Sequence, residues 1–124
     1  TAFVATVDNG KPRVRAMLVF YCNEREIIFV AGRGKEVCAE LKKNPQVELR
    51  FYSQNETKTL RIEAAAEFFA DKGLDEQILE KWPIAEMYVK NPDHPSFVTF
   101  RIRSGKASFW SLETSAKDTV SVEF

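Results

Sequence analysis

The chain contains very little histidine and cysteine, the side chains that form many metal centres. Its single histidine, His94, excludes a site built from several histidines. Its two cysteines, Cys22 and Cys38, have neither a C-x-x-C arrangement nor a metal-ligand spacing. We expect two buried, reduced thiols, with a disulfide as the alternative. His94 lies between prolines without an evident carboxylate or nucleophile partner, so a plain loop residue is favoured over a general base.

Long apolar runs and an excess of one charge sign are also absent. The longest apolar stretch, Ala16 to Cys22, is far shorter than the roughly 20 residues that cross a bilayer. Eighteen basic residues balance eighteen acidic ones, so no net field attracts nucleic acid or an anionic membrane. No signal peptide is visible. We expect a cytoplasmic protein with no nucleic-acid partner and no membrane partner.

No established nucleotide-binding or nucleophile motif is present. Gly32 and Gly34 lack the spacing of a P-loop, and Glu36 stands where that motif needs Ser or Thr after Lys35. There is no G-x-G-x-x-G, and no Ser/His/Asp or Cys/His arrangement stands out. These absences disfavour nucleoside triphosphate enzymes, Rossmann dehydrogenases and triad hydrolases.

The most informative positive feature is a glycine-bounded turn, residues 32–35, that leads into a short helix. Free backbone N–H groups at a helix start, the positive end of its dipole and Lys35 all favour an anion. Upstream, Arg13 and Arg15 lie on one face of an expected strand. If strand and helix start are neighbours, the three cations form a cradle for a phosphate-bearing ligand. The alternative is a solvated strand face and a surface lysine paired with glutamates.

Apolar segments separated by turn signals predict a strand-rich single domain over residues 1–124. The expected strands are 1–8, 12–21, 26–31, 47–53, 59–69, 96–103 and 106–112, and residues 120–124 could add an edge strand. The first two form a hairpin at Asn9-Gly10, and two further hairpins are expected, 47–53 with 59–69 and 96–103 with 106–112. Helices are expected at 35–43 and at 74–82. In the first, Val37, Cys38 and Leu41 form the inner stripe and Glu40 faces water; in the second, Leu74, Ile78 and Trp82 form the apolar stripe. Six or seven antiparallel strands with two short helices predict a mainly β fold, a barrel that removes exposed edges, with a sandwich as the alternative.

Four segments together resemble the pyridoxamine 5′-phosphate oxidase-like FMN-binding split-barrel family. They are Phe3–Arg15 (FVATVDNGKPRVR), Ile28–Val37 (IFVAGRGKEV), Leu41–Leu49 (LKKNPQVEL) and Leu60–Phe68 (LRIEAAAEF). Their order and spacing extend over nearly the whole chain and are most similar to the short general-stress and nitroimidazole-resistance (Nim-type) members. The resemblance implies a six-stranded antiparallel split barrel with two short helices, and a homodimer that holds FMN at its interface.

The resemblance also implies a set of cofactor-binding residues. Arg15 and Lys35 would hold the phosphate with Arg13 beside them, and Trp110 would reach the flavin of the partner subunit. Backbone near Ala16 and Met17 would lie along the isoalloxazine ring. The full set implied is Arg13, Val14, Arg15, Ala16, Met17, Val30, Ala31, Lys35 and Trp110.

The chain departs from the family pattern in ways that bear on activity. Ala16 stands where many relatives have proline, and Ala31 where many have threonine or asparagine. The C-terminal arginine and histidine that grip pyridoxal phosphate in the longer oxidases are absent, so we do not expect pyridoxamine phosphate oxidase activity. We expect an FMN-dependent oxidoreductase or reductase that uses a small-molecule electron acceptor and needs no side chain as acid or base. The alternatives are a non-catalytic flavin, haem or deazaflavin (F420) binding or sensor protein of the same fold, and an interaction module without a cofactor.

Overall fold

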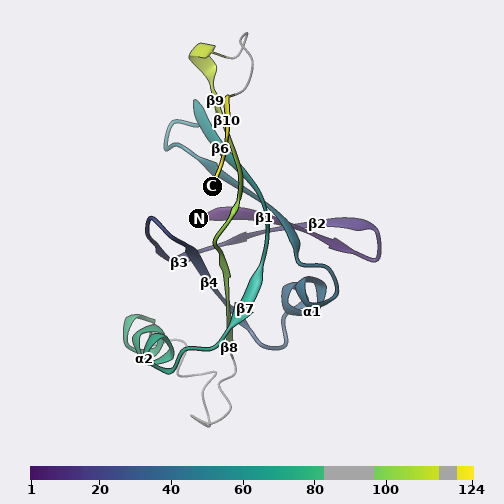
Figure 1. Cartoon of the computed structure of the whole chain (residues 1–124), viewed down its shortest axis with the longest axis vertical. Helices are drawn as coiled ribbons and strands as arrows, with labels where there is room; N and C mark the ends of the chain where they lie inside the picture. The colour runs from purple at the N-terminus through teal and green to yellow at the C-terminus, as the bar shows by residue number, and fades with distance from the viewer. Residues whose placement is uncertain (83–96, 115–119) are drawn as a thin grey trace.

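The computed structural model describes residues 1–82, 97–114 and 120–124. This part of the chain is mainly β, with ten strands, two α-helices and a short 3-10 helix at Leu112–Thr114 (Figure 1). His94 and the loop expected around it lie outside the described residues. No helix in the described ranges is long and apolar enough to span a membrane.

The described strands form two antiparallel sheets. The six-stranded sheet has the order β10-β9-β6-β5-β1-β2, and the four-stranded sheet has the order β3-β4-β8-β7. The larger sheet comprises β1 (Ala2–Asp8), β2 (Lys11–Met17), β5 (Gln46–Tyr52), β6 (Lys58–Ala65), β9 (Gly105–Ser111) and β10 (Val120–Glu123). The smaller sheet comprises β3 (Val19–Cys22), β4 (Ile27–Gly32), β7 (Glu67–Phe69) and β8 (Phe97–Ile102). Neither sheet closes on itself among these strands, so the predicted six-stranded barrel is not confirmed.

Three extended segments pass from one sheet into the other. The expected strand 12–21 breaks at Leu18 into β2 and β3, and the expected strand 59–69 breaks at Ala66 into β6 and β7. The hairpin expected between residues 96–103 and 106–112 is wrong, because β8 pairs with β4 and β7 whereas β9 pairs with β6 and β10. Strands that change sheets at a bend are the usual corners of packed β folds.

The other two expected hairpins are confirmed. β1 and β2 are joined by Asn9 and Gly10, with φ of 50° and 80°, the left-handed conformations that this tight turn requires. β5 and β6 pair in register from Gln46↔Ala65 to Tyr52↔Thr59.

Gly105 on β9 is needed for the close approach of β9 to β6. A Cβ there would lie 2.4 Å from the Glu63 carbonyl oxygen, so β9 could not approach β6 as closely.

The main core lies between the sheets and beneath α1 (Glu36–Lys43). Phe29 and Phe100 stack at its centre with ring centroids 5.1 Å apart. The predicted inner stripe of α1 is confirmed, since Val37, Cys38 and Leu41 are buried. The prediction that Glu40 faces water is wrong, because Glu40 is only 5% exposed.

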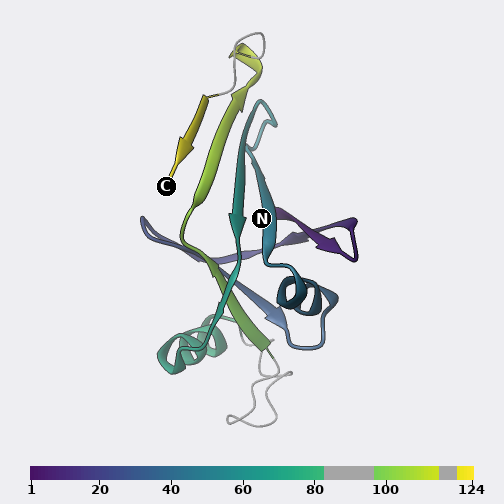
Figure 2. The same ribbon diagram turned by 45° about the vertical axis from the view of Figure 1, so that its right-hand side comes forward.

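A second cluster lies beneath α2 (Lys72–Lys81), at the four-stranded sheet (Figure 2). Asp71 begins this helix, and its side chain accepts a hydrogen bond from the Leu74 N–H at 2.9 Å. The expected apolar stripe is confirmed, with Ile78 fully buried against Phe20, Ile28 and Phe97.

Both cysteines are free, but only Cys38 is buried, so the expectation of two buried thiols is wrong for the exposed Cys22.

Candidate functional site

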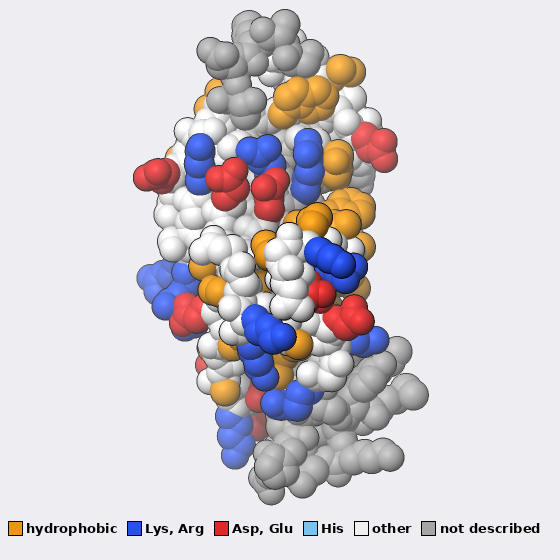
Figure 3. Space-filling model, turned by 90° about the vertical axis from the view of Figure 1, so that its right-hand side faces the viewer, with side chains coloured by type: hydrophobic (Ala, Val, Ile, Leu, Met, Phe, Trp, Pro, Cys, Tyr) orange, Lys and Arg blue, Asp and Glu red, His pale blue; other side chains and the backbone are white. Residues whose placement is uncertain are grey.

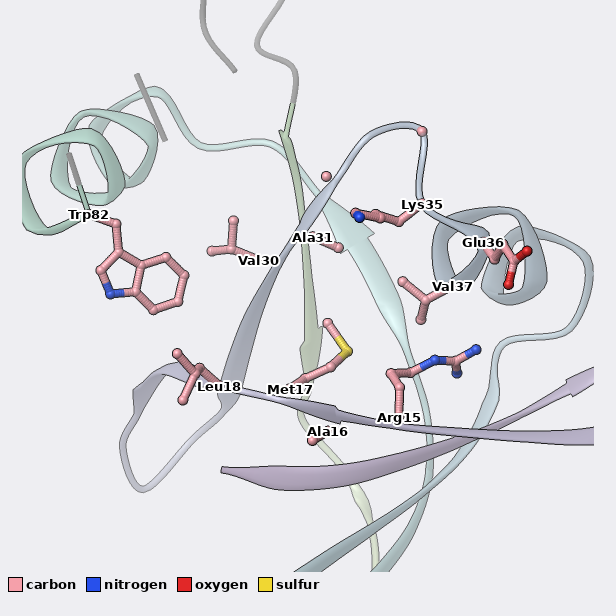
Figure 4. Close-up of a pocket in the computed structure, with 12 residues that line it drawn as sticks. Arg15, Ala16, Met17, Leu18, Val30, Ala31, Lys35, Glu36, Val37 and Trp82 are labelled. Atoms are coloured by element: carbon pink, nitrogen blue, oxygen red, sulfur yellow. The ribbon is translucent and has the colours of Figure 1, made fainter. Parts of the chain in front are cut away.

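A cavity of about 660 Å³ opens where the ends of β2 and β4 meet the start of α1 (Figure 4). This volume lies within the range of small-molecule sites. Two stretches far apart in the sequence, residues 15–18 and 30–37, build most of it, and the C-cap residue of α2, Trp82, adds to it. The lining residues are Arg15, Ala16, Met17, Leu18, Val30, Ala31, Gly32, Gly34, Lys35, Glu36, Val37 and Trp82.

Lys35 provides a cation at the N-terminal end of α1. Its backbone N–H donates to the Gly32 carbonyl at 3.0 Å, and the helix begins at the next residue. A Cβ at Gly32 would lie 3.2 Å from Lys35 Cγ, so the glycine leaves room for the lysine side chain to fold along the turn. Figure 4 shows the ammonium pointing back toward Ala31 across the cavity. Because the positive end of the helix dipole lies here as well, this end of the cavity favours an anion.

Arg15 lies at the same cavity, but it is already paired. Its Nη2 donates to Glu40 Oε1 at 2.5 Å and its Nη1 donates to Thr6 Oγ1 at 2.8 Å. In Figure 4 the guanidinium points toward α1. Burial by itself would raise the pKa of Glu40, but hydrogen bonds from Thr6 and Arg15 and the positive charges of Arg15 and Arg13 outweigh it and hold that pKa below its usual range. At the Arg15 end of the cavity, the positive charge of Arg15 is therefore compensated by the negative charge of Glu40.

The rest of the wall is apolar. Met17, Val30, Ala31 and Val37 line it, and Figure 4 shows Val37 between the Lys35 and Arg15 side chains. Figure 4 shows the Trp82 indole and Leu18 at that far end, away from Lys35. Trp82 also packs edge-on against Phe20, with ring centroids 5.1 Å apart and an interplanar angle of 82°. A ligand with an acidic end and a flat apolar end matches this division.

The structure brings together six of the nine residues predicted to bind the cofactor. Arg15, Ala16, Met17, Val30, Ala31 and Lys35 all line this cavity. Arg13 does not, and instead forms an exposed ion pair with Asp8, Nε to Oδ2 at 3.3 Å. Val14 is 69% exposed on the opposite face of β2. The three cations expected to converge are thus reduced to two at the cavity.

Trp110 lines a different cavity, of about 450 Å³, on the outer face of the six-stranded sheet. Around it are hydroxyl groups, a second aromatic ring and charges of both signs. The lining residues are Arg50, Tyr52, Glu56, Thr59, Arg61, Lys106, Ser108, Trp110 and Ser121. Within one copy of the chain, Trp110 and Lys35 therefore belong to separate cavities.

Sequence reasoning missed two residues near the site, Glu40 and Trp82. Glu40 follows Val37 by three residues and so shares its buried helix face, a signal that its charge obscured. The spacing of Trp82 from Leu74 and Ile78 predicts only a place in the apolar stripe of the second helix, and this residue does pack against the cluster beneath α2. Its contribution to the cavity depends on how α2 packs beside β3 and β4, which no local pattern reveals.

The chemistry available to the cavity is binding and orientation. Its titratable lining groups are Arg15, Lys35 and Glu36. Burial raises the pKa of the nearby Cys38 thiol, only partly opposed by the charges of Lys42 and Arg33, so this thiol is a poor nucleophile. Among the described residues no group of three His, Cys, Asp or Glu side chains could hold a metal.

Comparisons with solved structures give the same fold. A NimC/NimA family protein from Clostridium acetobutylicum has a TM-score of 0.79 at 18% identity, covering 99% of this chain and 82% of that one. A pyridoxamine 5′-phosphate oxidase-related, FMN-binding protein from Nostoc punctiforme has a TM-score of 0.72 at 14% identity, covering 99% and 86%. A protein named F420 reductase has a TM-score of 0.61 at 17% identity, covering 82% and 83%.

Sequence comparison assigns the family. No curated protein sequence matches the chain. Residues 1–111, most of the chain, match the family model described as pyridoxamine 5′-phosphate oxidase. The expected resemblance is confirmed, and the chain belongs to the pyridoxamine 5′-phosphate oxidase family.

Proposed function

We propose that the chain binds FMN in the cavity between β2, β4 and α1, and that it is a flavin-dependent oxidoreductase acting on a small-molecule electron acceptor. The observation that carries this proposal is the placement of Lys35 and Arg15 at one cavity whose remaining wall is apolar. Family membership supports it, as does the shared fold with an FMN-binding protein.

The cavity suits a phosphate at one end and a flat ring system beyond it. Lys35, the N–H groups of the first turn of α1 and the unused donors of Arg15 would hold the phosphate. Met17, Val30 and Ala31 would contact the apolar body of the cofactor, with Trp82 and Leu18 at the far end. The bound flavin supplies the redox chemistry. The chain's own residues bind it, orient it and keep water from its ring.

We also propose a homodimer in which the partner's Trp110 completes the site. One face of the six-stranded sheet supports this, because Phe3 and Val14 are 46% and 69% exposed and lie on the same side of β1 and β2. Phe3 contacts Tyr52 edge-on with centroids 5.9 Å apart, and Tyr52 lines the Trp110 cavity. Contiguous exposed apolar surface of this kind marks protein interfaces. It gives Val14 an interface role in place of a cavity role.

The same proposal treats the two sheets as one six-stranded split barrel. Its support is the continuity of β2 into β3, β6 into β7 and β8 into β9, which makes three segments common to both sheets. β1, β4 and β5 would complete the six.

A binder without turnover is the second candidate. Ala31 is buried in the cavity wall and offers no hydroxyl to a flavin, and Arg15 is compensated by Glu40. Because a protein named F420 reductase shares the fold, a deazaflavin is the competing cofactor.

The direct test is a visible absorption spectrum and a thermal melt of the purified protein with added FMN, riboflavin, haem or deazaflavin. We expect a flavin spectrum and the largest rise in melting temperature with FMN, together with a dimeric mass in solution. Steady-state reduction of a nitroaromatic or quinone by NAD(P)H then separates enzyme from binder. A colourless protein whose melting temperature is unaffected by FMN would overturn the proposal.

A further inference from the structure

A buried carboxylate lies directly behind the Arg15 end of the cavity. Glu40 on α1 is 5% exposed and Thr6 on β1 is 3% exposed. The Thr6 hydroxyl donates to Glu40 Oε1 at 2.5 Å, the same oxygen that accepts from Arg15 Nη2. Arg15 Nη1 donates back to Thr6 Oγ1 at 2.8 Å. Side chains from β1, β2 and α1 thus form one closed hydrogen-bonded set, which we name the Arg15 clamp.

The clamp leaves Arg15 with donors to spare. A guanidinium carries five N–H groups, and Thr6 and Glu40 take one each, so three remain. The Arg15 side chain is 25% exposed and lines the cavity, so it is accessible to a ligand there. An unrestrained arginine loses rotamer freedom when it binds an anion, whereas Arg15 is already ordered by its partners.

The charges around the clamp argue against a simple electrostatic role for Glu40. Lys35 and Arg15 bring two positive charges to the cavity, and Glu36 and Glu40 bring two negative charges to its edge and back. If net charge alone governed anion binding, Glu40 would weaken it. A buried acid held by two partners is expensive to maintain unless it does something else.

We propose that Glu40 and Thr6 are positioning residues that hold Arg15 in the orientation it needs to bind the acidic end of the ligand. The inference rests on the proposed function, since it takes that acidic end to be the phosphate of FMN. Lys35 forms no ion pair with any residue that the structure describes, so the proposal assigns it the uncompensated charge and assigns Arg15 the directional contact.

The positioning role and the net-charge role predict opposite signs for one substitution. Glu40→Gln keeps the size of the side chain and a carbonyl acceptor but removes the charge that locks Arg15. We expect the dissociation constant for FMN to rise about fivefold or more, with the constant for riboflavin, which lacks the phosphate, within about twofold of wild type. Thr6→Val should shift the two constants in the same pattern but less. Isothermal titration or flavin fluorescence quenching measures both ligands.

Three further variants test the effect of charge alone and whether Glu40 acts through Arg15. Glu36→Gln removes a carboxylate from the first turn of the same helix and from the edge of the cavity, and we expect it to tighten FMN binding. Arg15→Ala alone and Arg15→Ala with Glu40→Gln should bind FMN equally, because Glu40 acts only through Arg15. Tighter FMN binding by Glu40→Gln, or equal loss of FMN and riboflavin, would overturn the positioning role.

A ligand-free readout separates this inference from the proposed function. In protein labelled with ¹⁵N-arginine, Arg15 should give side-chain N–H signals protected from exchange, identified by their loss in Arg15→Ala. Those signals should broaden or vanish in Glu40→Gln. Signals unchanged by Glu40→Gln would overturn the positioning role. Failure of wild type to bind any flavin, with the signals behaving as expected, would reject the cofactor and leave the clamp intact.

Discussion

Two arginines of the six-stranded sheet have the same kind of partners in opposite surroundings. Arg15 on β2 pairs with Glu40, and their side chains are 25% and 5% exposed. Arg61 on β6 lies 3.4 Å from Glu48 and 3.2 Å from Glu63, and all three side chains are more than 40% exposed. The first group is held inside a closed set of hydrogen bonds at a cavity. The second lies on the outer face, where water competes for its exposed carboxylates. Exposure, and not the type of partner, decides how much each pair matters.

Other exposed charges of the molecule have neighbours of opposite sign, as Arg61 does. Figure 3 shows acidic and basic side chains lying next to one another on the face that it presents. Such pairs contribute little individually because solvent and salt screen them.

The largest expected difference between the two arginines is in the effect of Glu40→Ala on stability. Removing one partner of a buried pair leaves Arg15 with Thr6 alone, and we expect the free energy of unfolding to fall by about 3 kcal/mol, near the low end for such pairs because Arg15 is partly exposed. Urea or thermal unfolding followed by circular dichroism measures it. A loss below 0.5 kcal/mol, the size expected at the surface, would erase the distinction between the two arginines.

Lys35→Ala tests whether the cavity owes its anion preference to the uncompensated cation. We expect FMN affinity to fall at least tenfold, about 1.4 kcal/mol, with unchanged stability. Lys43→Ala is the matched control, since Lys43 is an exposed lysine at the other end of the same helix. Equal affinities for both variants would contradict the role of Lys35.

The loss of stability at acid pH provides a further comparison between a buried glutamate and an exposed one. The pKa of Glu40 is lowered in the folded protein, so its stabilising contribution is complete above its ordinary value near 4.5 and is lost as pH falls below that value. Glu67 behaves in the same direction, because a hydrogen bond from Arg101 lowers its pKa, but its side chain is 43% exposed. The free energy of unfolding should therefore depend less on pH, between neutral and acid pH, in Glu40→Gln than in Glu67→Gln. An equal effect of the two substitutions on this pH dependence would contradict the ranking.

The smallest effects are expected at Arg61. Glu48→Ala and Glu63→Ala should each change the free energy of unfolding by no more than about 0.5 kcal/mol, and less in high salt. The same unfolding measurement at two salt concentrations checks this. A loss comparable to that of Glu40→Ala would show that Arg61 depends on its partners as Arg15 does.

Local rules were sufficient where neighbours in sequence decide the structure. Asn9 and Gly10 adopt the positive φ that their hairpin requires, and Val37 and Leu41 bury the face that their spacing predicts. The Lys35 turn and the end of β2 meet at one cavity, as their charges suggested.

Local rules failed where a contact joins distant segments. The bends at Leu18 and Ala66 split continuous strand patterns between two sheets, and nothing in their alternation marks the change of partner. Arg13 and Arg15 are equivalent by alternation, yet Arg13 pairs with Asp8 at the surface and Arg15 with Glu40 inside. Glu40 contradicts the rule that charged helix residues face water because its partners come from β1 and β2.

The sequence alone therefore specifies which segments are extended or helical and which kinds of group are available to a ligand, because dihedral preference and side-chain periodicity act over a few residues. Which of its cations stays uncompensated, and which cavity each aromatic residue lines, emerges when β1, β2, β4 and the helices pack together. Burial sets the strength of an ion pair, and burial at any one position depends on segments from elsewhere in the chain.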